Sequence, residues 1–496
     1  MGDWLGLVQA LAPLVAAGLC ALVPTDHVRS LIAPTAAVAH LGLTLFSLFG
    51  PSRPSVGMLG FDAAAAPVLL VVSLLFVACT VYDIGYLGAT RHEGRAASAR
   101  IFYSCQLALV AALTVVIWSQ HLGLTWVAME ASALCIAPLL YFHKTAHSIE
   151  ATWKYLLVSS VGIALALLGS FFLAYASLHS GSVASLRFDD LVAQAPTLSA
   201  PWVHAAWVLL LVGYGTKMGL APLHTWKPDA YGEAPGVVGA MLAGGVTAGA
   251  FLVLARVHRV VVAAGIGDQA DRLLILIGVV SMAVAAAFLI QQRDLKRMLA
   301  YSSVEHMGIL ALGLGAGGIA ATGAMLHVVN NGLLKGLMFM TVGNVQRAYG
   351  TKRVDGEVIG ETRHPGIQGL LRKRPITGML FLFGFFAVTG SPPFGLFLSE
   401  LAIAYGLYAA DRPVVLGLYL ALLVVIFIGM GRTVLHVVQG VPAALPHDEA
   451  HEHRTRDTVT TVGPALVLLA LVLLVGLGLC PPVLRLAEAA AEGLAP

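Results

Sequence analysis

Charged residues are scarce in this sequence. They make up 11% of the 496 residues, whereas 58% are hydrophobic; ordinary soluble domains carry about 25% charged residues. This shortage excludes an ordinary soluble domain and indicates an all-α protein that crosses a lipid bilayer many times. The formal net charge of +3 is weak evidence about other partners, and we expect no nucleic acid among them.

Patterns that bind metals or nucleotides are also missing. The five cysteines lie singly in apolar segments without a C-x-x-C spacing, which argues against an iron–sulfur site or a disulfide framework. No G-x-x-x-x-G-K-[ST] motif occurs, which argues against nucleotide hydrolysis. GLGAGG at 313–318 lacks the strand and helix context of a dinucleotide site, so we interpret it as close helix packing. We therefore expect no cofactor in this chain.

A histidine-rich stretch, HDEAHEH, occupies positions 447–453. It lacks the H-E-x-x-H spacing of a zinc helix, so we interpret it as a solvated loop, with incidental metal binding as the alternative. We expect no metal site in this chain.

Long apolar segments recur along the whole sequence. A window of about twenty residues finds about fourteen of them. They lie near 4–23, 28–50, 63–88, 99–119, 121–141, 153–177, 202–222, 234–256, 270–290, 299–319, 320–347, 375–400, 412–438 and 459–484. The first has no basic flank or small-residue cleavage site, so we expect a retained helix and not a signal peptide.

Lysine and arginine are unevenly divided between the connecting loops. Most of them lie in loops that follow odd-numbered segments, and Lys227 is counted in one of these loops. Arg256 is counted in a loop that follows an even-numbered segment. Cytoplasmic loops carry the excess of positive charge. The odd loops are therefore expected in the cytoplasm and both termini outside, as in a bacterial-type inner (plasma) membrane.

The stretch GYGTKMGLAPLHTWKPDAYGEAP, residues 213–235, combines a buried cation with a broken helix. Lys217 lies within an apolar segment, and Pro222, Pro228 and Pro235 interrupt the chain after it. A lysine at membrane depth costs about 2.5 to 3.5 kcal/mol on insertion scales and needs a partner or a hydrated cavity. Interrupted helices at that depth survive only against protein or cavity water. The combination suggests an ion path.

Further ionisable residues accompany this stretch. Glu130 lies mid-way along the fifth segment, and Lys154 opens the sixth, where snorkelling to the interface is the alternative explanation. For Glu130 the alternative is a helix cap or an interfacial position. His224, Asp229 and Glu233 follow Lys217, and a solvated loop or backbone capping is the favoured interpretation for them. The first three segments contain almost no ionisable residue at depth, so we expect them to serve packing.

The second half carries a similar set. Glu305 and His306 open the tenth segment. His327, Asn331 and Lys335 are spaced four apart in the eleventh, so they stack on one face of a helix. Such a polar face suggests a hydrated path; a stripe that only joins two helices is the alternative.

A second break supports an internal repeat. Segment 12 is interrupted by SPP at 391–393, and Glu400 follows. Segments 7 and 12 are thus broken five apart, which predicts two inverted five-helix repeats, helices 4–8 and 9–13, of the kind that place sites near the midplane. The expected divisions are 1–98 (helices 1–3), 99–260 (first repeat), 261–440 (second repeat) and 441–496 (a cytoplasmic loop and helix 14).

Several of these stretches together resemble one known family. APLHTWKPDAYGEAP resembles the helix 7 signature of the antiporter-like subunits of respiratory complex I, and WVAMEASAL, RDLKRMLAYSSVEHMG, NNGLLKGLMF and GSPPFGLFLSE are similar to its other marks in the same order. Within the family, SSVEHMG and PPFGLFLSE look most like the F component of the hydrogenase 4 and formate hydrogenlyase group. The resemblance implies fourteen helices with two inverted repeats.

The resemblance also assigns roles by position. Glu130 matches the glutamate that pairs with the helix 7 lysine, here Lys217. Lys335 and His306 match the central and connecting protonatable groups, and Glu400 stands at the exit position of M-type subunits.

Three positions depart from the family pattern. Ala248 replaces a lysine of M-type subunits, Lys227 replaces the usual leucine, and Tyr231 replaces the usual histidine. Without that lysine, the route through the middle of the path that M-type subunits use is in doubt here, which favours Lys335 or His306 as the connecting group.

These features lead to one functional expectation and two alternatives. We expect a proton-translocating subunit without a catalytic centre, in a redox-driven complex related to NADH:quinone oxidoreductases and group 4 hydrogenases. Its partners would be other membrane-arm and peripheral redox subunits, and Fe–S, Ni–Fe or flavin groups would lie only in those partners. The alternatives are an Mrp-type Na+/H+ antiporter subunit and a structural scaffold.

Overall fold

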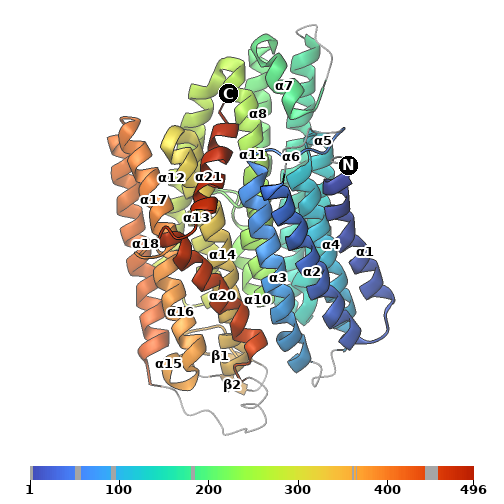
Figure 1. Ribbon diagram of the computed structural model, residues 1–496. Helices are drawn as coiled ribbons and strands as arrows, with labels where there is room; N and C mark the ends of the chain where they lie inside the picture. The colour runs from blue at the N-terminus through green and yellow to red at the C-terminus, as the bar shows by residue number, and fades with distance from the viewer. Residues whose placement is uncertain are drawn as a thin grey trace.

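The computed structural model describes residues 4–50, 57–90, 96–179, 185–359, 362–364, 366–441 and 456–495. These segments form a bundle of long helices that run roughly side by side (Figure 1). The HDEAHEH stretch lies outside the described residues, so its interpretation stays a prediction. Both chain ends lie toward one end of the bundle, and the single β-hairpin of the described segments lies at the other (Figure 1).

The first half of the chain is helical almost throughout. Its helices are α1 (Leu5–Leu22), α2 (Asp26–Phe49), α3 (Ala65–Thr90), α4 (Ala96–Trp118), α5 (Leu122–Leu140), α6 (Ala146–His179), the short α7 (Phe188–Gln194), α8 (Ala200–Met218), α9 (Trp226–Glu233), α10 (Gly236–Met241) and α11 (Thr247–Val261). A π-helical turn over Leu242–Val246 joins α10 to α11.

The second half contains the remaining helices and the hairpin. They are α12 (Gly267–Leu289), α13 (Leu295–Ala316), α14 (Gly318–Tyr349), β1 (Glu357–Ile359), β2 (Thr362–His364), α15 (Leu370–Lys373), α16 (Pro375–Val388), α17 (Gly395–Ala409), α18 (Pro413–Gln439), α20 (Val459–Gly476) and α21 (Pro481–Gly493). The single helix predicted over 459–484 is wrong, because the chain leaves the helix after Gly476 and restarts with Pro481 at the first position of α21.

The helices match a multi-pass membrane protein. Nine helices of the described segments are long and apolar enough to cross a membrane, with the stretch 236–289 taken as one, and α16 and α17 are shorter apolar helices. Many apolar side chains of α1, α2, α6 and α18 point outward, as lipid-facing helices require. The protein is therefore an all-helical, multi-pass membrane protein apart from the small hairpin.

Small residues let the central helices approach closely. Gly213 of α8 meets Ala166 of α6, and Gly278 of α12 meets Gly308 of α13. Membrane helices pack through such small residues because lipid supplies no hydrophobic drive for association. In GLGAGG, Gly313 packs against Ala320 and Ala324 and Gly315 against Leu274, which confirms the packing interpretation.

Two predictions about charges in the first half are wrong. Arg256, counted as a loop residue, lies inside α11 with 3% of its surface exposed, and binds Asp62 through two hydrogen bonds of 2.7 and 2.8 Å. The first three helices were expected to hold almost no ionisable group, yet Asp83 of α3 is fully buried. Both residues lie toward the end of a predicted apolar segment, 234–256 or 63–88, where hydropathy does not distinguish a buried charge from one at the membrane edge.

Candidate functional site

Buried ionisable side chains line the helices between the two interruptions of the bundle. They come from α8, α9, α13, α14 and α17, and between 0 and 7% of each is exposed; they are Lys217, Lys227, Glu305, His306, His327, Lys335 and Glu400. Ionisable groups inside a membrane protein are costly, face the protein interior and mark ion paths. Their mutual contacts therefore define the candidate site.

Lys217 lies at the first interruption. It is in the last turn of α8, which ends at Met218, and helix resumes only at Trp226. Its Nζ atom has no hydrogen-bond partner among the described residues and lies 5.6 Å from the centre of the Tyr155 ring. Glu130 interacts electrostatically with Lys217 but accepts its hydrogen bond from Ser160, at 2.8 Å. The expected Glu130–Lys217 pair is thus a through-space interaction here and not a direct hydrogen bond.

Lys227 belongs to the buried set, although the charge count of the sequence placed it in a loop. It is the second residue of α9 and is fully buried, and its Nζ atom donates to Ser303 Oγ of α13 at 3.0 Å. Gly219, which adopts φ +74°, makes room for this side chain, because a Cβ there would overlap Cδ and Cε of Lys227. The helix break therefore brings a second lysine into the interior, which the proline pattern around it did not reveal.

Lys335 and Glu305 share one hydroxyl group. Lys335 Nζ of α14 donates to Ser302 Oγ at 2.7 Å, and Ser302 Oγ lies 3.4 Å from Glu305 Oε2. Lys335 also interacts electrostatically with Glu305 and with Lys227. The serine links an ammonium group to a carboxyl group between α13 and α14.

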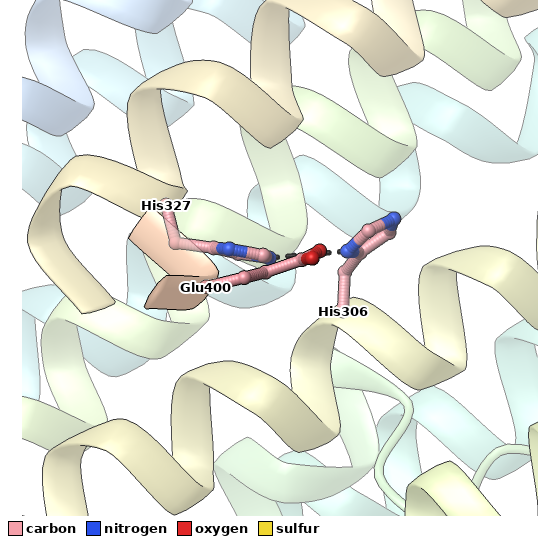
Figure 2. Close-up of side chains that lie close together, drawn as sticks. All are labelled: His306, His327 and Glu400. Carbon is pink, nitrogen blue, oxygen red and sulfur yellow. Dashed lines mark hydrogen bonds between the residues drawn. The ribbon is translucent and has the colours of Figure 1, made fainter. Parts of the chain in front are cut away.

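A second cluster continues from α13 and α14 to α17. His306 Nδ1 and His327 Nε2 share a hydrogen bond of 3.0 Å, and His327 Nδ1 lies 3.0 Å from Ser399 Oγ. The Glu400 side chain points at both rings (Figure 2), and the potential ligand atoms of the three residues lie within 4.8 Å of one another. His327 thus connects His306 to α17, a more central position than the sequence indicated.

Two histidines and a glutamate are also a donor set that a metal such as zinc accepts. However, the Lys335 and Lys227 ammonium groups both interact electrostatically with His306, and positive neighbours oppose a divalent cation. Positive charge on these two lysines would therefore disfavour a metal ion in this cluster.

Other polar residues singled out in the sequence lie around these clusters, either buried on α14 or in ion pairs on α9. Asn331 is buried on α14, and its Oδ1 atom has no partner within the described part of the chain. Asp229 and Glu233, expected in a solvated loop or in capping, lie on α9 and form ion pairs instead. Asp229 contacts Lys154 at 2.9 Å and also Arg297, and Glu233 contacts Lys352 at 2.7 Å.

His224 lies outside both clusters. Its half-buried ring lies 6.3 Å from that of Tyr301, between centres. The ion pairs of Asp229 and Glu233 hold α9 in place, and with it Lys227.

Glu400 depends on the second interruption, between α16 and α17. Gly390 there has φ +64°, and a Cβ on it would overlap the Glu400 carboxyl. We expect Gly390→Ala to destabilise the fold by at least about 1 to 2 kcal/mol, the cost of a left-handed non-glycine residue, and to displace Glu400. Thermal unfolding in detergent measures this effect. Gly417→Ala is the matched control, since a Cβ there meets open space; equal stability of both variants would contradict the prediction.

The fold and the buried row of charges together define a class of antiporter-like, multi-pass membrane subunits. The family model described as NADH:quinone oxidoreductase/Mrp antiporter, TM, matches residues 119–427. The chain belongs to this family, which confirms the resemblance drawn from the sequence.

Individual relatives agree with the family assignment. The chain is 32% identical over 366 residues to the Hydrogenase-4 component F homolog of Methylacidiphilum infernorum, covering 73% of this chain and 74% of that protein. A chain of respiratory complex I from Thermus thermophilus with bound Aureothin superposes with a TM-score of 0.73 and 26% identity, over 96% of this chain and 98% of that one. A chain of the Mrp complex from Dietzia sp. DQ12-45-1b shares the fold, with a TM-score of 0.85 at 18% identity over 99% and 97% of the chains.

Proposed function

We propose that this chain translocates protons through the membrane as one subunit of a redox-driven complex. The observation that carries the proposal is the row of buried ionisable groups, in which Ser302 links Lys335 to Glu305, His306 contacts His327, and Lys227 donates to Ser303. Groups of similar chemistry within hydrogen-bond reach of one another, or of a shared hydroxyl, can exchange protons directly or through one water. The proposed relay contains Glu130, Lys217, His306, Lys335 and Glu400.

The relay would begin at Glu130 and Lys217. A movement of Glu130 relative to Lys217 would change how tightly the lysine holds its proton, and each tenfold change in proton affinity corresponds to about 1.36 kcal/mol. Lys227 would connect Lys217 to Lys335. It compensates for Ala248 of α11, which offers no ionisable group where M-type relatives carry a lysine. From Lys335 the proton would pass His306 and His327 to Glu400.

Two matching breaks support the proposed inverted repeats. In each break a glycine with positive φ, Gly219 or Gly390, makes room for an ionisable side chain, and a proline follows three positions later. We therefore propose about fourteen spans, with helices 4–8 and 9–13 as repeats. The proposed divisions are 1–98, 99–260, 261–440 and 441–496, with both termini on the outer face of a bacterial inner membrane.

Partner subunits would supply the redox chemistry. The relatives are named as components of hydrogenases, quinone oxidoreductases and respiratory membrane complexes, and such complexes combine membrane and peripheral subunits. We propose that Fe–S, Ni–Fe or flavin groups lie in those partners and that this chain is a membrane-arm subunit. Likeness to the Mrp complex chain makes a Na+/H+ antiporter subunit the second candidate.

The choice between protons and sodium can be made with the reconstituted complex. We expect redox-driven acidification or alkalinisation of proteoliposomes to continue at an unchanged rate when choline replaces all sodium. The buried hydrogen bonds of Lys227, Lys335, His306 and His327 are made by nitrogen atoms, whereas sodium prefers oxygen ligands. A protonophore serves as the control that collapses the gradient. Proton movement that stops without sodium, with matching uptake of radioactive sodium, would favour the antiporter.

A further inference from the structure

A buried acid outside the proposed relay lies between α3 and α4. Asp83 of α3 has none of its surface exposed, and neither of its carboxyl oxygens has a hydrogen-bond partner in the described segments. Gln106 of α4 is 2% exposed and lies close enough to interact with Asp83. Both polar atoms of the Gln106 amide also lack a partner there. Four buried polar atoms thus meet in one place: the Gln106 amide acts on the Asp83 carboxyl as a hydrogen-bond donor does, but no bond of ordinary length and angle joins them.

The attachment of α3 to α14 does not depend on Asp83. The residue before it, Tyr82, already joins α3 to α14 by donating to Asn344 Oδ1 at 2.9 Å, and Asn344 Nδ2 donates to the Thr461 carbonyl of α20 at 2.8 Å. Buried polar groups normally have partners, and the unpaired ones in native proteins bind internal water or serve a function. The Asp83 and Gln106 atoms have the chemistry to hold internal water.

The depth of Asp83 follows from the packing of α3 on α14. Val71, Leu75 and Tyr82 contact Gly332, Gly336 and Gly343 in turn, so the two helices run in the same direction and in step. Asp83 is therefore level with Asn344, about 13 Å along α14 from Lys335. This displacement is toward the end of α14 that leads into the β1–β2 hairpin (Figure 1).

We propose that Asp83 and Gln106 form a proton-binding site with internal water, which loads protons into the relay from the hairpin end of the bundle. The Asp83 carboxylate accepts a proton from hydronium on the hairpin side, which leaves neutral water, and then releases this proton through internal water toward Lys335, so only O–H and N–H bonds are exchanged. Cys79 and Tyr82 of the same helix interact electrostatically with Asp83, and Tyr82 also interacts with Tyr86 and with Arg347 of α14. This inference rests on the proposed proton relay.

The test uses the complete complex in proteoliposomes. We expect Asp83→Asn to assemble but to slow redox-driven proton transport about tenfold or more, because the amide cannot carry a proton. Asp83→Glu restores most of the rate. Ser73→Ala is the matched control on the same helix: it removes the hydrogen bonds to Thr44 and His40, so it lowers thermal stability while leaving the transport rate per assembled complex close to wild type.

Two further measurements separate a proton-binding role from a structural one. We expect infrared spectra of the wild type to contain a protonated-carboxyl band that disappears in Asp83→Asn, and we expect Gln106→Leu to shift the pH profile of transport. Wild-type transport in Asp83→Asn overturns the inference. If that variant does not assemble, an unchanged pH profile in Gln106→Leu overturns it instead. Loss of transport in Lys335→Met with normal transport in Asp83→Asn refutes this site alone, whereas normal transport in both refutes the relay.

Discussion

In the Lys335→Met variant, the rate of redox-driven proton transport is expected to fall about a hundredfold or more, while the chain remains assembled in its complex. Methionine fills a volume similar to that of the lysine side chain but has no group that binds a proton. The substitution removes the donor to Ser302 and the cation that faces Glu305. A positioned proton-transfer group contributes about 10²- to 10⁴-fold to such steps. The measurement is the initial rate of pH change in proteoliposomes at equal electron flux.

The same variant decides between the relay and a structural scaffold. If the buried charges only lock helices together, Lys335→Met lowers assembly and leaves transport per assembled complex unchanged. Glu305 would be left without its cation in that variant, and an unpaired buried charge destabilises. The double variant Lys335→Met, Glu305→Gln removes this penalty and should recover stability without recovering transport. Lys144→Met, at an exposed lysine, is the control; it should change neither the stability nor the transport rate.

The sequence predicted the helical fold and most of the buried charges because each of them is marked by a local feature of the sequence. Lys217 and Lys335 stand alone in apolar runs, and the spacing of His327 and Lys335 places both on one helix face. The interruption after Met218 followed from the prolines. The family assignment drawn from these residues is confirmed by the match over 119–427.

Residues near the breaks were harder to place from the sequence. Lys227 has prolines and polar residues around it, as a loop lysine does, and only the path of the chain past Gly219 brings it inside. Arg256 and Asp83 lie in apolar helices, but their burial depends on which helices become neighbours. The partners of such groups come from distant parts of the chain, as Asp62 does for Arg256, so no local pattern predicts them.

Replacing Arg256 with methionine is expected to lower the free energy of unfolding by about 3 kcal/mol, the lower end of the cost of breaking a buried ion pair. The guanidinium forms two hydrogen bonds with Asp62 and donates to the Ser119 and Ile117 carbonyls at 3.0 and 2.8 Å. The Asp62 side chain keeps 33% of its surface exposed, so water takes up part of the lost interaction. Unfolding in mixed micelles measures the difference. Arg256→Lys should recover only part of it, because lysine lacks the bidentate geometry.

Acid should reduce the difference in the free energy of unfolding between the wild type and Arg256→Met. Burial raises the pKa of Asp62, but the charge and hydrogen bonds of Arg256, together with hydrogen bonds from the Ala65 backbone and from Gln120, outweigh burial and hold that pKa below its usual value. The stabilisation from the pair is therefore complete above the unfolded pKa of about 3.9 and is lost as the pH falls through the lower folded value. In Arg256→Met this pair is already gone, so its stability changes less over that range. A difference that stays constant from neutral to acid pH would show that Arg256 stabilises the fold through its carbonyl contacts and packing and not through Asp62.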